Sequence, residues 1–215
     1  MNAKSLVLTL AVAAIGTGCA APERSRNLND PSIAPRTMAE QVCSTCHGID
    51  GNSVSPNFPR LAGQMPDYTI EQLKAFRGHS RSDPAGFEYM WGLSRHLTDA
   101  QIEGLAAYFA SRAPMPNTET PVSPGLATAG REIFEKGILS ASVPPCAGCH
   151  GASAQGNEKF PRLAGQHADY LVKQLGVFQR TDERPEGAVM KVIAHQLTEA
   201  NIAAVSAYLQ SVPPL

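Results

Sequence analysis

Two copies of a five-residue motif hold the residues of this sequence that are best suited to chemistry. Each copy has the form Cys-x-x-Cys-His, with Cys43, Cys46 and His47 in the N-terminal half and Cys146, Cys149 and His150 in the C-terminal half. Cysteines three positions apart lie on one face of a helical turn, and the next residue projects beside them. This spacing is the attachment motif of haem c, in which both thiols form thioethers and the histidine binds the iron. The sequence therefore predicts two covalently bound haem c groups.

Other uses of paired cysteines fit this sequence less well. A zinc site with four cysteines usually has about 15 to 20 residues between its two pairs, whereas about a hundred residues separate the pairs here. Disulfides within each pair would be exposed redox pairs and would leave the histidine after both pairs without a role. Haem attachment is therefore favoured.

The chain contains an internal duplication. The segment Phe-Pro-Arg-Leu-Ala-Gly-Gln occurs at 58–64 and again, unaltered, at 160–166. A tyrosine, a Gln-Leu pair and a phenylalanine follow both copies at the same spacing. Self-similarity of this kind indicates two homologous domains. We expect them at 30–114 and 125–215, joined at 115–124 by a proline-rich stretch that is typical of a stiff linker.

Each half has the pattern of an all-α domain. Apolar residues at helical spacing predict last helices over 99–111 and 199–211, and Thr98 with Gln101 matches a capping box. Pro66 is suited to the first turn of a middle helix. Residues 36–46 and 126–137 predict a further helix in each half, and no segment shows the alternation of a strand.

Met90 and Met190 are the candidates for the second axial ligand of each iron. Among the residue types considered, only methionine recurs at equivalent places, eight residues before Thr98 and Thr198. An isolated methionine would be interpreted as core filler, but recurrence favours ligation, although two extra residues lie between Gln72 and Met90 compared with the second half. Ligation by histidine and methionine closes both faces of the iron and leaves reversible one-electron transfer as the chemistry.

The arginine in each copy of the repeated segment is a candidate for binding a haem propionate. The guanidinium fork of Arg60 or Arg162 matches a carboxylate in shape and charge. The alternative is a solvated arginine on the surface.

Further residues of the repeat are candidates for the surroundings of the haem. Pro59 and Pro161 are expected to place a backbone carbonyl against the Nδ1 proton of the motif histidines, which would fix the orientation of the rings. Tyr68 and Tyr170 are either donors in a haem pocket or core residues, and the sequence does not decide between these roles.

The N-terminal segment 1–21 is typical of a secretory signal. Lys4 precedes an apolar run at 6–15, which is too short to span a bilayer and ends in small residues. Cys19 follows these small residues, so both lipid attachment at Cys19 and ordinary cleavage nearby stay open. Either outcome places the mature chain outside the cytoplasm.

The charge balance argues against nucleic acid as a partner. With 18 Lys and Arg against 19 Asp and Glu, the chain lacks the basic field that holds a phosphate backbone. Docking to proteins is expected to use local patches of charge.

Taken together, the motifs resemble those of dihaem cytochromes of the cytochrome c4 family. The resemblance covers residues 36–212 and rests on the two Cys-x-x-Cys-His motifs, the repeated segment and the methionine before each last helix. It implies two tandem class I cytochrome c domains, packed about a pseudo-twofold axis with their haem propionate edges facing. By matching position, the first haem is served by Cys43, Cys46, His47 and Met90, and the second by Cys146, Cys149, His150 and Met190.

The resemblance also implies a function. Members of this family are periplasmic, are often associated with the membrane, and carry electrons between redox proteins. The expected donor is a protein such as a quinol-oxidising complex, and the expected acceptor is a terminal oxidase or a reductase. One departure from the repeat is the segment 137–145, which is longer than its counterpart before the first motif.

Two other functions stay open at this point. One is a haem enzyme of the dihaem peroxidase type, in which one iron lacks its second ligand; the methionine available in both halves argues against it. The other is a haem subunit held permanently in a dehydrogenase complex.

Overall fold

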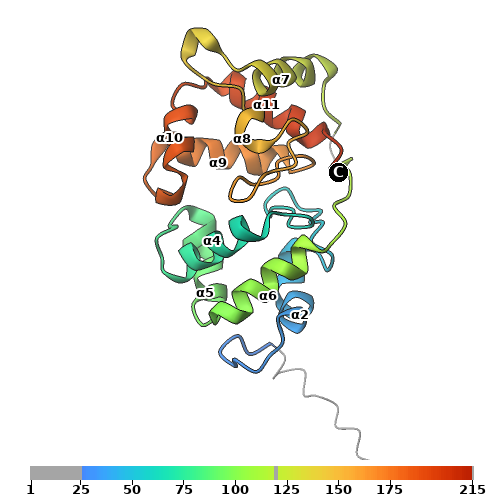
Figure 1. Cartoon of the computed structure of the whole chain (residues 1–215), viewed down its shortest axis with the longest axis vertical. Helices are drawn as coiled ribbons and strands as arrows, with labels where there is room; N and C mark the ends of the chain where they lie inside the picture. Colours follow the sequence, from blue (N-terminus) through green and yellow to red (C-terminus); the bar gives the residue numbers. More distant parts are fainter. Residues whose placement is uncertain (1–25, 119–120, 215) are drawn as a thin grey trace, which may run out of the picture.

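The computed structural model describes residues 26–118 and 121–214. The signal segment 1–21 and Cys19 lie outside these residues. The described chain is helical and contains no strand; its only ladder contacts are isolated bridges of Ile138 with Val143 and of Asn157 with Phe160. Two helical domains lie one above the other along the long axis of the molecule (Figure 1). The predicted all-α class with two duplicated domains is confirmed.

The N-terminal domain begins with a helical segment that runs without a break into the first cysteine motif. Its elements are α2 (Pro35–Met38), η1 (Ala39–Cys43), α3 (Ser44–His47), α4 (Pro66–Arg77), η2 (Gly86–Met90), α5 (Trp91–Ser94) and α6 (Asp99–Ala110). Helix α6 packs against both α2 and α4. Met38, Ile102 and Phe109 belong to the buried core of this domain.

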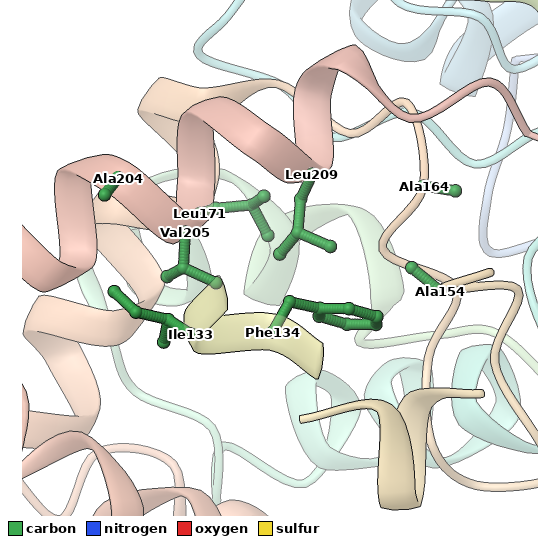
Figure 2. Close-up of a cluster of buried hydrophobic side chains, with 8 residues drawn as sticks. All are labelled: Ile133, Phe134, Ala154, Ala164, Leu171, Ala204, Val205 and Leu209. Carbon is green, nitrogen blue, oxygen red and sulfur yellow. The ribbon is translucent and has the colours of Figure 1, made fainter. Parts of the chain in front are cut away.

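The C-terminal domain repeats this arrangement. Its elements are α7 (Pro124–Lys136), η3 (Leu139–Ala141), α8 (Ala147–His150), α9 (Ala168–Arg180), η4 (Pro185–Gly187), α10 (Ala188–Ala194) and α11 (Glu199–Ser211). Helix α11 packs against α7 and α9. Figure 2 shows its core, in which the ring of Phe134, fully buried, lies near Leu209, Val205 and Ala154.

Local sequence signals set the ends of these helices. The backbone N–H of Gln101 donates to Thr98 Oγ1 at 3.2 Å, and Gln101 Oε1 accepts from the N–H of Thr98 at 3.0 Å, so the predicted capping box is present. Thr198 and Asn201 form the same box at the start of α11. Helix α4 starts at Pro66, as expected from its place in a first turn.

A glycine lets the terminal helices of each domain cross closely. A Cβ atom at Gly130 of α7 would overlap the carbonyl of Ala204 in α11, and one at Gly104 of α6 would overlap the ring of Pro35 in α2. The glycine lies on the first helix in one domain and on the last in the other. Close backbone approach therefore needs a glycine on only one of the two crossing helices.

The longer segment 137–145 forms a small closed loop before the second motif. Gly137 has a φ of 73°, and the backbone N–H of Ile138 bonds to Val143 O at 2.9 Å while the N–H of Val143 bonds back at 3.1 Å. The side chain of Val143 is buried. The extra residues thus form a hydrogen-bonded loop directly before the turn that carries Cys146.

Candidate haem sites and the domain interface

A short helical turn carries each Cys-x-x-Cys-His motif. In the first domain Cys43 ends η1, and Cys46 and His47 lie in α3. In the second domain Cys146 caps α8, which contains Cys149 and His150. All four cysteines are free thiols. The two thiols of each motif are therefore available for thioether bonds, with the histidine on the same turn.

A backbone carbonyl holds each motif histidine. Nδ1 of His47 lies 2.9 Å from Pro59 O, and Nδ1 of His150 lies 2.9 Å from Pro161 O. A carbonyl oxygen only accepts hydrogen bonds, so Nδ1 carries the proton and Nε2 is left with its lone pair for iron. Burial lowers the pKa of both imidazoles, against the smaller opposite effect of the carbonyls. Both histidines are therefore held in the neutral form that binds a metal.

The first residue of each repeated segment also meets the motif histidine. The ring of Phe58 packs edge-on against His47 at 6.3 Å between centroids, and the ring of Phe160 packs edge-on against His150 at 6.1 Å. Sequence reasoning did not assign a role to these phenylalanines. Their recurrence directly before Pro59 and Pro161 was the signal that could have found them.

One thiol in each motif lies in apolar surroundings. Burial raises the pKa of Cys43 to about 11 and that of Cys146 to about 11. These sulfur atoms are therefore uncharged near neutral pH, as a thioether sulfur also is.

The two candidate methionines lie in the segments that precede the last helices. Met90 ends the π-helical turn η2, and Met190 lies in α10; both side chains are half-buried. The two extra residues before Met90 fall in a loop and a π-helical turn, where the second domain has a 3-10 turn and a regular helix. A π-turn accommodates insertions in a helix and is frequent at functional sites.

Arg60 and Arg162 are buried in the interface between the domains. Arg60 Nη1 donates to Met115 O at 2.9 Å and Gly165 O at 3.2 Å. Arg162 Nη2 donates to Ala62 O in the other domain at 2.7 Å, and its Nη1 bonds to Ala164 O. The side chains are 4% and 3% exposed, so the alternative of solvated surface arginines is wrong.

The guanidinium of Arg162 lacks a full set of partners. Its Nε is buried and has no hydrogen-bond partner among the described residues. Burial, together with the charge of Arg60, lowers the pKa of Arg162 to about 10. A buried anion beside Arg162 would satisfy Nε and offset both effects, so the site fits a haem propionate.

Gln64 and Gln166 pair the two copies of the repeated segment across the interface. Gln64 Oε1 accepts from the backbone N–H of Arg162 at 2.7 Å, and its Nε2 donates to Arg162 O at 3.1 Å. Gln166 makes the same two bonds to the backbone of Arg60, at 2.9 and 3.1 Å. Sequence reasoning missed this role. The signal was a polar residue that recurs in a segment otherwise assigned to the haem.

The linker between the domains is hydrogen-bonded to both of them. The backbone N–H of Met115 donates to Asn52 Oδ1 at 2.9 Å. Asn117 Nδ2 donates to Nδ1 of His167 at 3.1 Å, and Nε2–H of His167 donates to Ser53 O at 2.8 Å. One buried histidine of the second domain therefore holds both the linker and a loop of the first domain.

The described residues contain no group of three or more His, Cys, Asp or Glu that could hold a metal ion. Across the same residues, no helix has the length and apolarity that crossing a membrane requires.

Comparison with known proteins agrees with this geometry. The family model for cytochrome c matches residues 35–113 and 127–213. A cytochrome c4 of Azotobacter vinelandii is 39% identical over 178 residues, which cover 79% of this chain and 83% of that protein. The solved cytochrome c4 structure from Acidithiobacillus ferrooxidans superposes with a TM-score of 0.74 at 39% identity, over 79% of this chain and 97% of that one.

A further relative has a name that states its partner. A thiosulfate dehydrogenase electron acceptor of Stutzerimonas stutzeri is 39% identical over 177 residues, covering 81% of this chain and 80% of that protein. The duplicated motifs, the helical domains and these likenesses agree. The chain belongs to the cytochrome c family, is similar throughout its two domains to cytochrome c4, and is a dihaem electron-transfer cytochrome with two covalently bound haem c groups.

Proposed function

We propose that this protein is a periplasmic one-electron carrier between respiratory redox proteins. The N-terminal segment 1–21 directs its export, and the domains at 30–114 and 125–215 each hold one haem. The donor is a protein such as a quinol-oxidising complex, and the acceptor is a terminal oxidase or a reductase. The observation that carries this proposal is the pair of equivalent sites, in which a proline carbonyl holds each motif histidine.

The chain's own residues hold and enclose each haem. When bound, haem c supplies a reversible one-electron couple. The cysteines of each motif would hold it covalently, and one histidine and one methionine would bind its iron. We assign Cys43, Cys46, His47 and Met90 to the first haem, and Cys146, Cys149, His150 and Met190 to the second. With a histidine and a methionine both bound, the iron would offer no open site to oxygen or peroxide.

The proline carbonyls orient the axial histidines. The Nδ1–H bonds to Pro59 O and Pro161 O fix the tautomer and the ring plane. They also increase the electron donation of Nε2, which stabilises the oxidised metal. The protein thereby fixes the orientation of each histidine ring before any redox partner binds.

Arg60 and Arg162 are assigned to the propionates. Both guanidinium groups are buried where the two domains meet, and Arg162 keeps an unpartnered Nε there. Their positive charge opposes the gain of a positive charge on oxidation. We therefore assign them a role in raising both reduction potentials.

Attachment of a lipid at Cys19 would anchor the exported protein to the membrane, and we propose to test it. The described residues contain no helix that could cross a membrane. Mass spectrometry of the mature protein would show either an acylated Cys19 at the N-terminus or a chain cleaved nearby without lipid.

Optical redox titration in the presence and absence of carbon monoxide tests the carrier function. We expect both haems to show the weak long-wavelength band of methionine-ligated ferric haem and neither to bind carbon monoxide. Met90→Ala and Met190→Ala should each open one iron to carbon monoxide, whereas Met115→Ala, on an exposed methionine of the linker, should change nothing. Binding of carbon monoxide to the unmodified protein would contradict the proposal and favour peroxide or gas chemistry.

A haem subunit of a dehydrogenase complex is the second candidate. The similarity to a thiosulfate dehydrogenase electron acceptor favours it. Purification from the natural source distinguishes the two, because a carrier is recovered alone and a subunit in a stoichiometric complex.

A further inference from the structure

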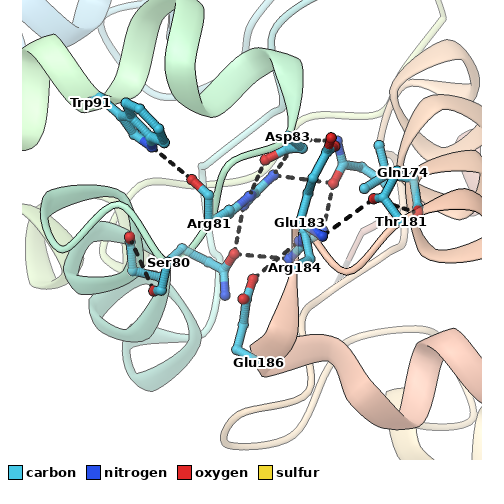
Figure 3. Close-up of polar contacts among 12 residues, drawn as sticks. Ser80, Arg81, Asp83, Trp91, Gln174, Thr181, Glu183, Arg184 and Glu186 are labelled. Carbon is cyan, nitrogen blue, oxygen red and sulfur yellow. Dashed lines mark hydrogen bonds and ion pairs between the residues drawn. The ribbon is translucent and has the colours of Figure 1, made fainter.

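A second buried polar cluster joins the two domains. Its residues lie outside the two copies of the repeated segment. It is formed by the loops that lead to Met90 and Met190, together with residues of α4 and α9 (Figure 3). The backbone N–H of Ser82 donates to Glu183 O in the other domain at 2.8 Å. The two methionine-bearing segments are therefore tied to each other through their preceding loops.

Two arginines and two glutamines form the centre of this cluster. Arg81 donates through Nη1 to Gln72 Oε1 at 2.5 Å and through Nη2 to Gln174 Oε1 at 3.1 Å. Arg184 donates through Nη1 to Gln174 Oε1 at 2.5 Å and through Nη2 to Gln72 Oε1 at 2.8 Å. Each guanidinium thus bridges the glutamine of its own domain and that of the other domain, in a pattern with twofold symmetry.

The surroundings of both arginines follow the same symmetry. Each is paired with the carboxylate two residues further on and lies over the phenylalanine of its own middle helix. The contacts are Arg81 to Asp83 at 2.8 Å, Arg184 to Glu186 at 3.1 Å, Arg81 over Phe76 at 4.4 Å and Arg184 over Phe178 at 4.7 Å.

This cluster is well suited to fix one relative orientation of the domains. The side chains of Arg81 and Arg184 are 3% and 7% exposed. A buried ion pair contributes little net stability, but it specifies geometry because an unpaired partner is costly. A guanidinium holds two acceptors in a rigid fork, which the single ammonium of a lysine does not reproduce.

We propose that Arg81 and Arg184, with Gln72 and Gln174, form an interdomain clamp that positions the two haems for electron transfer between them. The arginines are positioning residues, since they act through the orientation of the domains. This inference rests on the proposed carrier function. Electron transfer between two centres falls steeply as they move apart, so a domain shift slows it without changing either haem's ligands.

The clamp is tested by removing the fork while keeping the charge. In the haem-loaded protein, Arg184→Lys should slow electron transfer between the haems at least tenfold after rapid photochemical reduction of one haem. Gln72→Leu should have a similar effect, whereas Gln72→Glu keeps an acceptor oxygen for both guanidinium groups and should restore the rate to within about twofold. Lys173→Gln is the matched control, because Lys173 makes an exposed interdomain bond to Asn57 at 2.8 Å.

The accompanying spectra distinguish the possible failures. The methionine–iron band and the two reduction potentials should stay unchanged in Arg184→Lys. An unchanged rate between the haems in Arg184→Lys and Gln72→Leu would overturn the clamp. A loss of rate in Gln72→Glu equal to that in Gln72→Leu would also overturn it. If Arg184→Lys fails to fold, Arg81→Lys carries the same expectation. Failure of the carrier function would instead appear in the unmodified protein, as an iron that binds carbon monoxide.

Discussion

The backbone N–H of Arg162 donates a 2.7 Å hydrogen bond to Oε1 of Gln64, which belongs to the other domain. The amide group of Gln64 returns a bond to Arg162 O, so one side chain satisfies both backbone groups of a buried residue. The repeated segment whose Pro161 carbonyl holds the motif histidine His150 therefore also builds the domain interface.

Gln64→Leu is predicted to destabilise the protein by about 1 to 3 kcal/mol, because it leaves a buried N–H and a buried carbonyl of Arg162 unpaired. Chemical denaturation of the haem-loaded protein measures this loss. Gln196→Leu changes an exposed glutamine and serves as the control. Equal denaturation midpoints for Gln64→Leu and the control would show that the pairing contributes nothing.

Arg162→Met is predicted to lower the reduction potential of the second haem. Removing a buried positive charge favours the oxidised form, and one charge acting over about 10 Å at an effective dielectric constant of about 20 is worth about 1.7 kcal/mol. Potentiometric titration measures the change. Arg131→Met, on an exposed arginine of α7, should leave both potentials unchanged. A potential for Arg162→Met that equals the unmodified value would remove Arg162 from the propionate assignment.

Thr198→Ala is predicted to destabilise α11 by about 1 kcal/mol, because it removes the side chain that caps the N–H of Asn201. Thr98→Ala should cost the first domain a similar amount. Thr128→Ala, whose hydroxyl only bonds back to Pro124 O within α7, is the matched control. Thermal unfolding of the three variants tests the difference, and a loss in Thr128→Ala as large as in Thr198→Ala would contradict the capping argument.

Local signals were enough to predict α4, α6, α7, α11 and the cysteine motifs, but not the helices α5 and α10, which precede the last helix of each domain. The capping threonine before each last helix and Pro66 in the first turn of α4 act within one turn of the chain, so their effect can be derived from neighbouring residues. The cysteine motifs are equally local, since their geometry is that of a single helical turn.

The interdomain contacts could not be derived in this way. Arg81 and Arg184 are spaced 103 residues apart, whereas Gln72 and Gln174 are 102 apart, so aligning the repeats does not place the two arginines opposite each other. Only the folded loops bring them to equivalent positions. Burial of Arg60 was also hidden, because it results from packing against the other domain and not from the apolar pattern of its own segment.

Asp83→Asn is predicted to remove part of the acid sensitivity of the folded protein. Burial alone would raise the pKa of Asp83, but the adjacent Arg81, with Gln174, outweighs it, and the pKa lies below the ordinary value of 3.8. Because the folded pKa lies below the unfolded one, the ionised group stabilises the fold above about pH 4. This stability is lost as the pH falls through the lowered pKa, when Asp83 takes up a proton.

Denaturant unfolding of the haem-loaded protein between about pH 3 and pH 7 measures this effect. Asp83→Asn should be less stable than the unmodified protein at pH 7, because the neutral amide does not pair with the buried charge of Arg81. The difference should begin to narrow as the pH falls below about 4, where Asp83 of the unfolded chain takes up a proton, and should disappear only below the lowered pKa of the folded protein. Asp169→Asn, on an exposed residue of α9, controls for the loss of one carboxylate. A difference between Asp83→Asn and the unmodified protein that stays constant across the whole range would show that the ionisation of Asp83 does not support the clamp.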